Sequence, residues 1–275
     1  MRLAVFASGS TGNSLLLSDN NTHILIDAGL SMRRIQGFLF QTGLSWRDLA
    51  GVLITHEHSD HISGLETMAK KTEVPVFAPH TVANRLLGRF PALADRLRVI
   101  PVGEEFALGA LRVLAFRTPH DTDESVGYRV SGSAVFALAT DIGCVTDEIR
   151  AGLRGADAAL IEANHDLQML RDGPYPFPLK RRILSDRGHL SNERCAALAR
   201  ELAEGGTKTL VLGHLSRENN RPALALRTVG EALLGLDVSL CCAPALGPME
   251  IEFASAAGDQ AFPLRGRWHG ASRDG

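Results

Sequence analysis

Residues 56–61 read His-Glu-His-Ser-Asp-His, which places three imidazoles and a carboxylate within six residues. Neutral imidazoles and carboxylates form a mixed nitrogen and oxygen ligand set that suits Zn²⁺ and also Mn²⁺ or Fe²⁺. Residues spaced this closely cannot all bind one ion from a single loop. The spacing therefore predicts that His56 and His58 bind one metal ion, while Asp60 and His61 bind a second.

Two metal ions need more ligands than these four residues, and three others lie in suitable places. His120, Asp141 and His214 each come just after a predicted apolar strand. Side chains at strand ends are held by a rigid scaffold, which is where binding and catalytic residues are expected. Taken singly, each is equally expected as an ordinary hydrogen-bonded polar residue. Their order along the chain, after the histidine-rich run, favours a ligand set.

Two further histidines, His165 and His189, are candidates for catalysis rather than for metal binding. Histidine is suited to proton transfer near neutral pH, so each is predicted to bind phosphate or to protonate a leaving oxygen. Ser191 is placed to cap a helix predicted at 191–203, and a helix N-terminus presents free N–H groups to anions. His189 lies just ahead of this helix. The alternative for both histidines is a surface or capping role.

Several polar side chains are predicted to donate hydrogen bonds to phosphate, although serine and asparagine are equally typical of turns and caps. These substrate-binding candidates are Asn13, Ser191, Ser216 and Asn219.

Short apolar runs separated by turn residues predict strands throughout the chain. The predicted strands cover residues 3–7, 15–18, 23–27, 51–55, 75–78, 111–118, 126–130, 135–140, 157–163 and 207–213. The predicted helices cover residues 31–42, 80–89, 145–153, 191–203 and 222–234. This mixture indicates a layered αββα sandwich with mixed sheets rather than an all-parallel fold.

The sequence shows no internal repeat and no linker, so one domain is predicted over residues 1–254. Residues 173–178 contain three prolines and are predicted to form an ordered loop rather than a helix. Residues 255–275 are rich in glycine, arginine and alanine and are predicted to be a flexible tail.

Charge and composition give no global attraction to a polyanion. The 275 residues include 29 basic and 31 acidic side chains, a formal net charge of −2. Any nucleic-acid binding must therefore come from a local patch, such as Lys70-Lys71 or residues 180–182, although short basic runs are more often solvated helix faces. Aromatic residues make up only 5%, which argues against an extensive base-stacking platform.

The four cysteines form no C-x-x-C pair, which is typical of reduced thiols rather than of a disulfide framework. Residues 1–6 are too short for the core of a signal peptide, and no apolar run is long enough to span a membrane. The sequence therefore predicts a cytoplasmic protein without membrane association. Nothing in it indicates an obligate protein partner or an oligomeric state.

Residues 25–29 (Leu-Ile-Asp-Ala-Gly), the histidine-rich run and the three later candidates resemble, in this order, the five sequential motifs of the metallo-β-lactamase superfamily, over residues 1–254. The resemblance implies a four-layer αββα fold and two divalent metal ions. It implies the following ligand sets: His56, His58 and His120 for one ion, and Asp60, His61 and His214 for the other, with Asp141 bridging. Asp27 would order the metal-binding loop from behind.

Such a pair of ions lowers the pKa of a shared water and clamps the oxygens of a phosphodiester. Asp60 and Asp141 are the expected catalytic carboxylates, because a carboxylate-rich site favours hard metals and phosphoryl chemistry. Residues 8–14, 162–166, 188–192 and 214–220 are similar to the YycJ/WalJ-type bacterial family, whose members are regarded as 5′-to-3′ DNA exonucleases or phosphodiesterases. DNA is therefore the expected substrate.

Other readings of the same motifs stay open or are disfavoured. A small-molecule phosphodiesterase or a glyoxalase-II-like thioesterase is the enzymatic alternative, although the thioesterases end in a helical domain. A zinc β-lactamase would be exported and would carry cysteine in place of Asp141, and a β-CASP nuclease would need a large insert. A non-catalytic binding module is disfavoured because every expected ligand is present.

Overall fold

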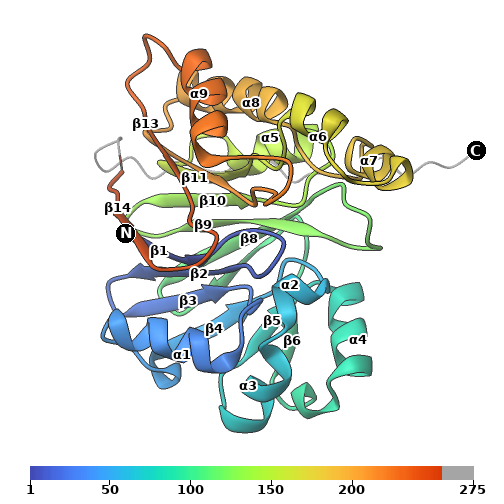
Figure 1. Ribbon diagram of the computed structural model, residues 1–275. Coiled ribbons are helices and arrows are strands. Elements are labelled where there is room, and N and C mark those ends of the chain that lie inside the picture. Colours follow the sequence, from blue (N-terminus) through green and yellow to red (C-terminus); the bar gives the residue numbers. More distant parts are fainter. Residues whose placement is uncertain (256–275) are drawn as a thin grey trace, which may run out of the picture.

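The strands form two seven-stranded sheets that pack face to face, and helices cover the outer side of each sheet (Figure 1). This computed structural model describes residues 1–255. Three separate clusters of buried apolar side chains fill the three interfaces between the four layers. The predicted αββα sandwich is therefore confirmed.

The first sheet is built mainly from the N-terminal part of the chain. Its strands, in spatial order, are β14 (Met249–Glu252), β1 (Arg2–Ala7), β2 (Ser14–Asp19), β3 (Thr22–Ile26), β4 (Leu49–Leu53), β5 (Val76–Ala78) and β6 (Leu97–Val99). Pairing is antiparallel from β14 to β3 and parallel from β3 to β6. The inner strands are buried on both faces, and they are therefore continuous apolar runs rather than alternating ones.

The second sheet changes from antiparallel to parallel pairing in the same way. Its strands, in spatial order, are β13 (Ser239–Cys242), β12 (Thr209–Gly213), β11 (Ala158–Glu162), β10 (Val135–Ala139), β9 (Val126–Ser131), β8 (Leu111–Arg117) and β7 (Glu105–Leu108). Pairing is antiparallel from β7 to β10 and parallel from β10 to β13. The parallel strands β10, β11 and β12 end next to one another at one edge of the sandwich.

Helices on the two outer layers bury one apolar side each. The first sheet is covered by α1 (Met32–Gln41), α3 (Leu65–Lys71) and α4 (His80–Arg89), and the second by α5 (Asp147–Leu153), α8 (Asn192–Glu204) and α9 (Pro222–Ala232). In α1, for example, Ile35 and Leu39 are buried four residues apart, as a single apolar face requires. The remaining short helices are α2 (Ser59–Ile62), α6 (Leu167–Asp172), α7 (Phe177–Ile183) and the 3₁₀ turns η1 (Trp46–Asp48) and η2 (Pro91–Leu93).

Every predicted strand and helix is present, with ends that differ by at most a few residues. The prediction of a loop over residues 173–178 is wrong at its end, because Phe177 and Pro178 begin α7. Proline is tolerated in the first turn of a helix, where its missing N–H has no partner to lose. The short elements α2, α3, α6, β6 and β7 were not predicted, since so few residues carry little periodicity.

Within residues 1–255, no helix has both the length and the apolar character needed to cross a membrane. The predicted C-terminal tail lies outside the described residues, apart from Ser255.

Candidate metal centre

The histidine-rich run is divided between a loop and a short helix. The chain leaves β4 at Leu53 and reaches His56 and His58 in the loop, whereas Asp60 and His61 lie in α2. His56 and His58 share one group of possible ligands with His120, and Asp60 and His61 share another with His214. Two further groups overlap with these: His56 and His61 with Asp141, and Asp141 with Glu162, His189 and His214.

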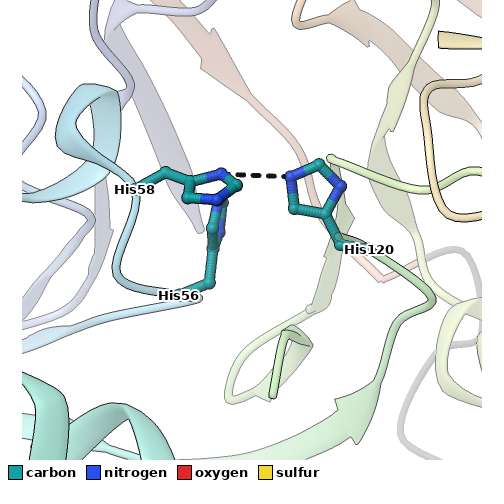
Figure 2. A group of neighbouring side chains, drawn as sticks. All are labelled: His56, His58 and His120. Carbon is teal, nitrogen blue, oxygen red and sulfur yellow. Dashed lines mark hydrogen bonds between the residues drawn. The ribbon is translucent and has the colours of Figure 1, made fainter. Parts of the chain in front are cut away.

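The first group consists of His56, His58 and His120, whose rings converge (Figure 2). Nε2 of His120 lies 3.2 Å from Nδ1 of His58. The ring of His56 lies 5.0 Å from that of His120 and 4.7 Å from that of His58, between centroids. His120 follows β8, so a residue of the second sheet completes a set that begins in the first.

The second group consists of Asp60, His61 and His214. Oδ2 of Asp60 lies 3.6 Å from Nε2 of His61 and 3.5 Å from Nε2 of His214. His214 directly follows the last residue of β12, again in the second sheet.

Asp141 lies between the two groups. Its Oδ2 atom is 3.3 Å from Nε2 of His61, while its Oδ1 atom is 3.4 Å from Nε2 of His214 and 3.7 Å from Nε2 of His120. One carboxylate therefore reaches histidines of both groups, the arrangement expected of a residue shared by two ions.

The donor atoms fit metal ions in spacing and in chemistry. Ligands about 2.0–2.1 Å from a tetrahedral ion lie roughly 3.3 Å from one another, and the donor pairs above are 3.2 to 3.7 Å apart. Nε2 of His56 and Nε2 of His214 are buried and have no hydrogen-bond partner among residues 1–255. Buried polar atoms are normally satisfied, so these orphaned nitrogens also favour a metal ligand.

Asp27 holds this arrangement from behind, as predicted. It follows β3, and its Oδ2 atom lies 2.7 Å from Nδ1 of His61. Its other oxygen accepts a hydrogen bond from the backbone N–H of Thr55, at 2.9 Å, and Oγ1 of Thr55 lies 3.0 Å from Nδ1 of His56. A carboxylate on Nδ1 fixes the tautomer and leaves Nε2 of His61 for a metal. The role of Thr55 was not predicted, because a threonine at a strand end carries no distinctive pattern.

The buried charges of the centre stabilise one another. Burial lowers the pKa of His61, but the carboxylates of Asp27 and Asp141 outweigh it and hold the pKa well above its usual value. Burial raises the pKa of Asp141, but His214 and His61 outweigh it and hold that pKa well below its usual value. Asp141 is therefore ionised near neutral pH, as a ligand must be.

Glu162 contacts two of the candidate site residues, although it was not itself predicted as one. It ends β11 and is fully buried, and its Oε1 atom lies 2.8 Å from Nδ1 of His189 and 2.9 Å from Nδ1 of His214. Its Oε2 atom accepts from the backbone N–H of Ile142, at 2.8 Å. Burial raises the pKa of Glu162, but His189 and His214 together outweigh it and lower the pKa to about 2. The sequence did contain a signal for Glu162. It ends an apolar strand, as do the strands that lead to Asp141 and His214, and a glutamate at such a position is a candidate site residue.

His189 lies close to two of the possible metal ligands, His120 and His214. Its ring centroid lies 5.3 Å from that of His120 and 5.3 Å from that of His214. Nδ1 is held by Glu162, which leaves Nε2 as the free atom of the ring. Burial lowers the pKa of His189, but the carboxylate of Glu162 raises it above its usual value.

Two of the predicted substrate-binding residues make internal bonds instead of facing outward. The hydroxyl of Ser191 accepts from the N–H of Arg194 and so caps α8 as predicted. Nδ2 of Asn13 lies 3.0 Å from Nε2 of His61 and 3.3 Å from Oδ2 of Asp60, so Asn13 contacts the ligand set directly.

The other predicted residues belong to none of the groups of possible ligands. Ser216 and Asn219 hydrogen-bond to each other within one turn after His214, and the side chain of Asn219 is buried. His165 is buried too, neither of its ring nitrogens has a hydrogen-bond partner within residues 1–255, and burial lowers its pKa to about 4. His165 is therefore neutral near pH 7, whereas the pKa of His189 is shifted in the opposite direction.

Comparisons with known proteins agree with this geometry. The family model described as "Beta-lactamase superfamily domain" matches residues 22–215. The chain is 39% identical to the exodeoxyribonuclease YycJ of Bacillus anthracis over 237 residues, which cover 85% of this chain and 89% of that protein. It is 37% identical to the exodeoxyribonuclease WalJ of Streptococcus pneumoniae over 245 residues, covering 87% and 90%.

A solved structure also has this fold. Zn²⁺-bound PqqB from Methylobacterium extorquens superposes with a TM-score of 0.70 over 92% of this chain and 100% of that one, at 18% sequence identity. At that identity the likeness shows a shared fold and nothing about substrate.

Proposed function

Because the chain belongs to the β-lactamase superfamily and, within it, to the family of the YycJ and WalJ exodeoxyribonucleases, we propose that it is a two-metal hydrolase that degrades DNA from the 5′ end. The substrate and the direction of cleavage come from the relatives. The proposed mechanism of cleavage is inferred from the residues that meet at the edge of the sandwich.

One observation carries the metal assignment. Asp141 extends one oxygen toward His61 and the other toward His214 and His120, so it joins two groups of three ligands. In the proposed centre, His56, His58 and His120 would hold the first ion, and Asp60, His61 and His214 would hold the second. Asp141 would be the ligand common to both sets.

Two divalent ions would supply a water of lowered pKa as the nucleophile and positive charge for the phosphate oxygens. The chain's own residues have complementary tasks. Glu162 holds both His189 and His214 by their Nδ1 atoms, so the two rings keep fixed orientations. Nε2 of His189 belongs to neither proposed ligand set, and we assign it to hydrogen-bond the phosphate or to protonate the leaving oxygen. His165 makes no hydrogen bond to Glu162 like that of His189. We propose that it only shapes the site beside His189.

The nature of the donors bears on which metals bind. Five imidazoles and two carboxylates, of which only Asp141 is shared, form a nitrogen and oxygen set without thiolate, which suits Zn²⁺ and also Mn²⁺ or Fe²⁺. We propose Zn²⁺ or Mn²⁺ as the ions to test first. Elemental analysis of the purified protein identifies them, and at most one ion per chain would contradict the two-ion assignment.

We further propose that the protein acts in the cytoplasm. Its four cysteines, all within the described residues, are unpaired. Free thiols are typical of a reducing compartment, which is also where chromosomal DNA is found in bacteria.

The function is tested by offering the metal-loaded protein a panel of substrates. The panel contains single- and double-stranded DNA labelled at either end, RNA, bis-p-nitrophenyl phosphate, a β-lactam and an acyl-glutathione thioester. We expect stepwise release of nucleotides from the 5′ end of DNA and no hydrolysis of the β-lactam. An Asp141→Ala preparation, purified identically, controls for contaminating host nucleases.

The possible outcomes separate the alternatives. Efficient hydrolysis of the thioester without activity on any phosphodiester would replace the proposal by a glyoxalase-II-like function. Activity on bis-p-nitrophenyl phosphate but on no nucleic acid would make the protein a small-molecule phosphodiesterase. Cleavage from the 3′ end would overturn the proposed direction only.

A further inference from the structure

We propose that helix α7 binds the single-stranded DNA that leads into the metal centre, through Phe177, Lys180 and Arg181, which we call the α7 surface. The inference rests on the proposed function, because it names the part of the molecule that holds the strand to be cut. Nothing in the ligand sets requires this helix, so its features need a separate explanation.

The first feature is an exposed aromatic ring. The side chain of Phe177 is 76% exposed. Exposure alone proves little, since Phe40 on α1 is 81% exposed, and single apolar residues on a surface are common. The difference is the setting. Phe177 shares its helix with three successive basic residues, one of which pairs with Asp121 next to His120, whereas α1 lies on the other side of the molecule (Figure 1).

The second feature is unbalanced positive charge. Arg182 forms an ion pair with Asp121, but within residues 1–255 neither Lys180 nor Arg181 pairs with a carboxylate. Nζ of Lys180 donates instead to the backbone carbonyl of Arg171, at 2.7 Å, which leaves its charge uncompensated. Because the whole chain carries a net charge of −2, this is a local concentration of positive charge and not a general property.

The third feature is a connection to the metal centre. Asp121, the partner of Arg182, has its Oδ1 atom 3.3 Å from Nε2 of His120. Just after α7, Arg187 donates to the backbone carbonyls of His120, at 2.7 Å, and Thr122, at 2.6 Å. The helix and the segment that follows it therefore contact the loop that carries a proposed metal ligand.

The length of the helix suits a short stretch of nucleic acid. Seven residues at about 1.5 Å each give a helix of roughly 10 Å. A strand that rises about 3.4 Å per nucleotide covers this distance with roughly three nucleotides. A strand cut at the metal centre can therefore lie along α7, with phosphates near Lys180 and Arg181 and a base against Phe177.

The combination favours single-stranded over double-stranded DNA. Basic side chains alone would bind phosphates of either form, but an aromatic ring can stack only on a base whose face is free. An exposed phenylalanine beside unpaired cations is the pattern of a single-strand site, on a small scale. This agrees with the low aromatic content, since one ring is enough to serve one base.

Binding is measured by fluorescence anisotropy with the full-length, metal-loaded protein. The probe is a 3′-fluorescein-labelled thymidine oligonucleotide of about 20 nucleotides with phosphorothioate linkages, which resist cleavage. We expect Phe177→Ala to raise Kd about 5- to 100-fold, the range for loss of one stacked base. The matched control, Phe40→Ala, removes an equally exposed ring from α1 and is expected to leave Kd within about twofold.

The charges are tested by the salt dependence of the same binding. Each phosphate contact in a single strand contributes about 0.7 to the slope of log Kd against log salt concentration. The double variant Lys180→Ala/Arg181→Ala is therefore expected to lower the slope by about 1.4. The control is Arg33→Ala/Arg34→Ala, which removes two exposed arginines from α1 and is expected to leave the slope unchanged.

A kinetic ratio links binding to function. We expect the α7 variants to lower the ratio of kcat/KM on the long strand to kcat/KM on a dinucleotide, while metal content and Tm show that the fold is intact. Wild-type binding with no effect of Phe177→Ala would overturn the α7 surface and leave the exonuclease proposal standing. If Phe177→Ala weakened binding to single strands and to duplexes equally, stacking of a base on Phe177 would be ruled out. A wild-type protein that neither binds nor cleaves DNA would refute the proposed function, and this inference with it.

Discussion

Asp141 contacts histidines from both halves of the chain, and few other residue types could do so. A carboxylate has two oxygens that can point to different neighbours, and here one lies 3.3 Å from His61 and the other 3.4 Å from His214. A histidine would offer one atom in this direction, and a cysteine would offer one sulfur. The predicted bridging position of Asp141 therefore agrees with the distances.

We predict that Asp141→Ala abolishes cleavage while the fold survives. Loss of the shared carboxylate leaves both ligand groups incomplete, so activity should fall by more than about 10³-fold, beyond the effect of losing one hydrogen-bond donor. Metal content should fall below two ions per chain. Activity on DNA, elemental analysis and circular dichroism check the three parts.

Asp123→Ala is the matched control, because Asp123 is an exposed carboxylate on the neighbouring loop that pairs with Arg85. It should keep nearly full activity and both ions. Near-normal turnover by Asp141→Ala at saturating metal would show that Asp141 does not bridge.

We predict different phenotypes for His189→Ala and Glu162→Gln, although the two side chains share a hydrogen bond. His189 belongs to neither proposed ligand set, so its loss should slow DNA cleavage about 10²–10³-fold with both ions retained. Glu162 also holds His214, so its loss should in addition weaken one metal site by about 10- to 100-fold. Metal titration and kcat/KM on DNA separate the two cases.

His80→Ala, at an exposed histidine on α4, serves as the control for removal of an imidazole. If His189→Ala lost a metal ion, His189 would be a ligand and the assignment of the sets would need revision. If its rate were unchanged, His189 would be a turn residue before α8 and nothing more.

Functional residues are predictable from the sequence when several of them lie close together along the chain. Three histidines and an aspartate within six residues are conspicuous, and the distances support the predicted grouping. Glu162 is distant in sequence from His189 and His214, which it holds, and Thr55 directly precedes His56 but stands alone without a distinctive pattern. Their importance arises from tertiary contacts, which no local pattern contains.

At the scale of elements, the ends of parallel strands position the site. Asp27 follows β3, Asp141 closely follows β10 and His214 follows β12, and each adopts a positive φ, of 59°, 56° and 54°. This left-handed conformation is unfavourable for residues with a side chain, and it persists only where surrounding contacts enforce it. Sharp turns at the strand ends thus direct these side chains into the site. The strands were predictable as buried apolar runs, but the turn conformations were not.

Gly29 shows how closely two of these elements meet. A Cβ atom at this position would lie 1.7 Å from the backbone oxygen of Asp60 and 2.5 Å from the backbone nitrogen of Asn13. We predict that Gly29→Ala displaces α2, lowers the free energy of unfolding by about 1–3 kcal/mol and weakens metal binding by Asp60 and His61. Denaturant unfolding and metal titration measure these effects.

Gly37 provides the opposite case within the neighbouring helix α1. A Cβ atom there would have no neighbour within 4 Å, so Gly37→Ala should stabilise the helix by roughly 0.5–1 kcal/mol and leave metal affinity unchanged. A neutral effect of Gly29→Ala on both measurements would mean that α2 shifts freely, and that the close approach does not set the position of Asp60.

At the scale of the whole molecule, the site is formed where the two sheets meet. The first sheet and α2 supply four of the proposed ligands, and the second sheet supplies His120, Asp141 and His214. Each sheet changes from antiparallel to parallel pairing at its fourth strand, although the sequence shows no repeat. The strands could be predicted from apolar runs, but their spatial order is a long-range property, and here it came only from the resemblance.

Because the ligands come from both halves, bound metal should join the halves without being required for folding. Three apolar clusters fill the interfaces of the sandwich, so the core does not depend on the ions. The buried carboxylates of Asp27 and Asp141 also keep partners in the metal-free protein, since both contact His61. Removing the ions therefore leaves no isolated buried charge, which would be the costly outcome.

We predict that the metal-free protein, prepared with a chelator, keeps its secondary structure but melts at a lower temperature. A ligand at about 100 times its Kd stabilises the native state by about 2.7 kcal/mol. At about 2–4 °C per kcal/mol for a domain of this size, Tm should rise by roughly 5–11 °C when metal is restored. Asp141→Ala, which is expected to bind metal weakly, should show a much smaller rise under the same conditions. Calorimetry and circular dichroism of both proteins test this, and collapse of the secondary structure on chelation would show that the ions hold the two sheets together rather than only the site between them.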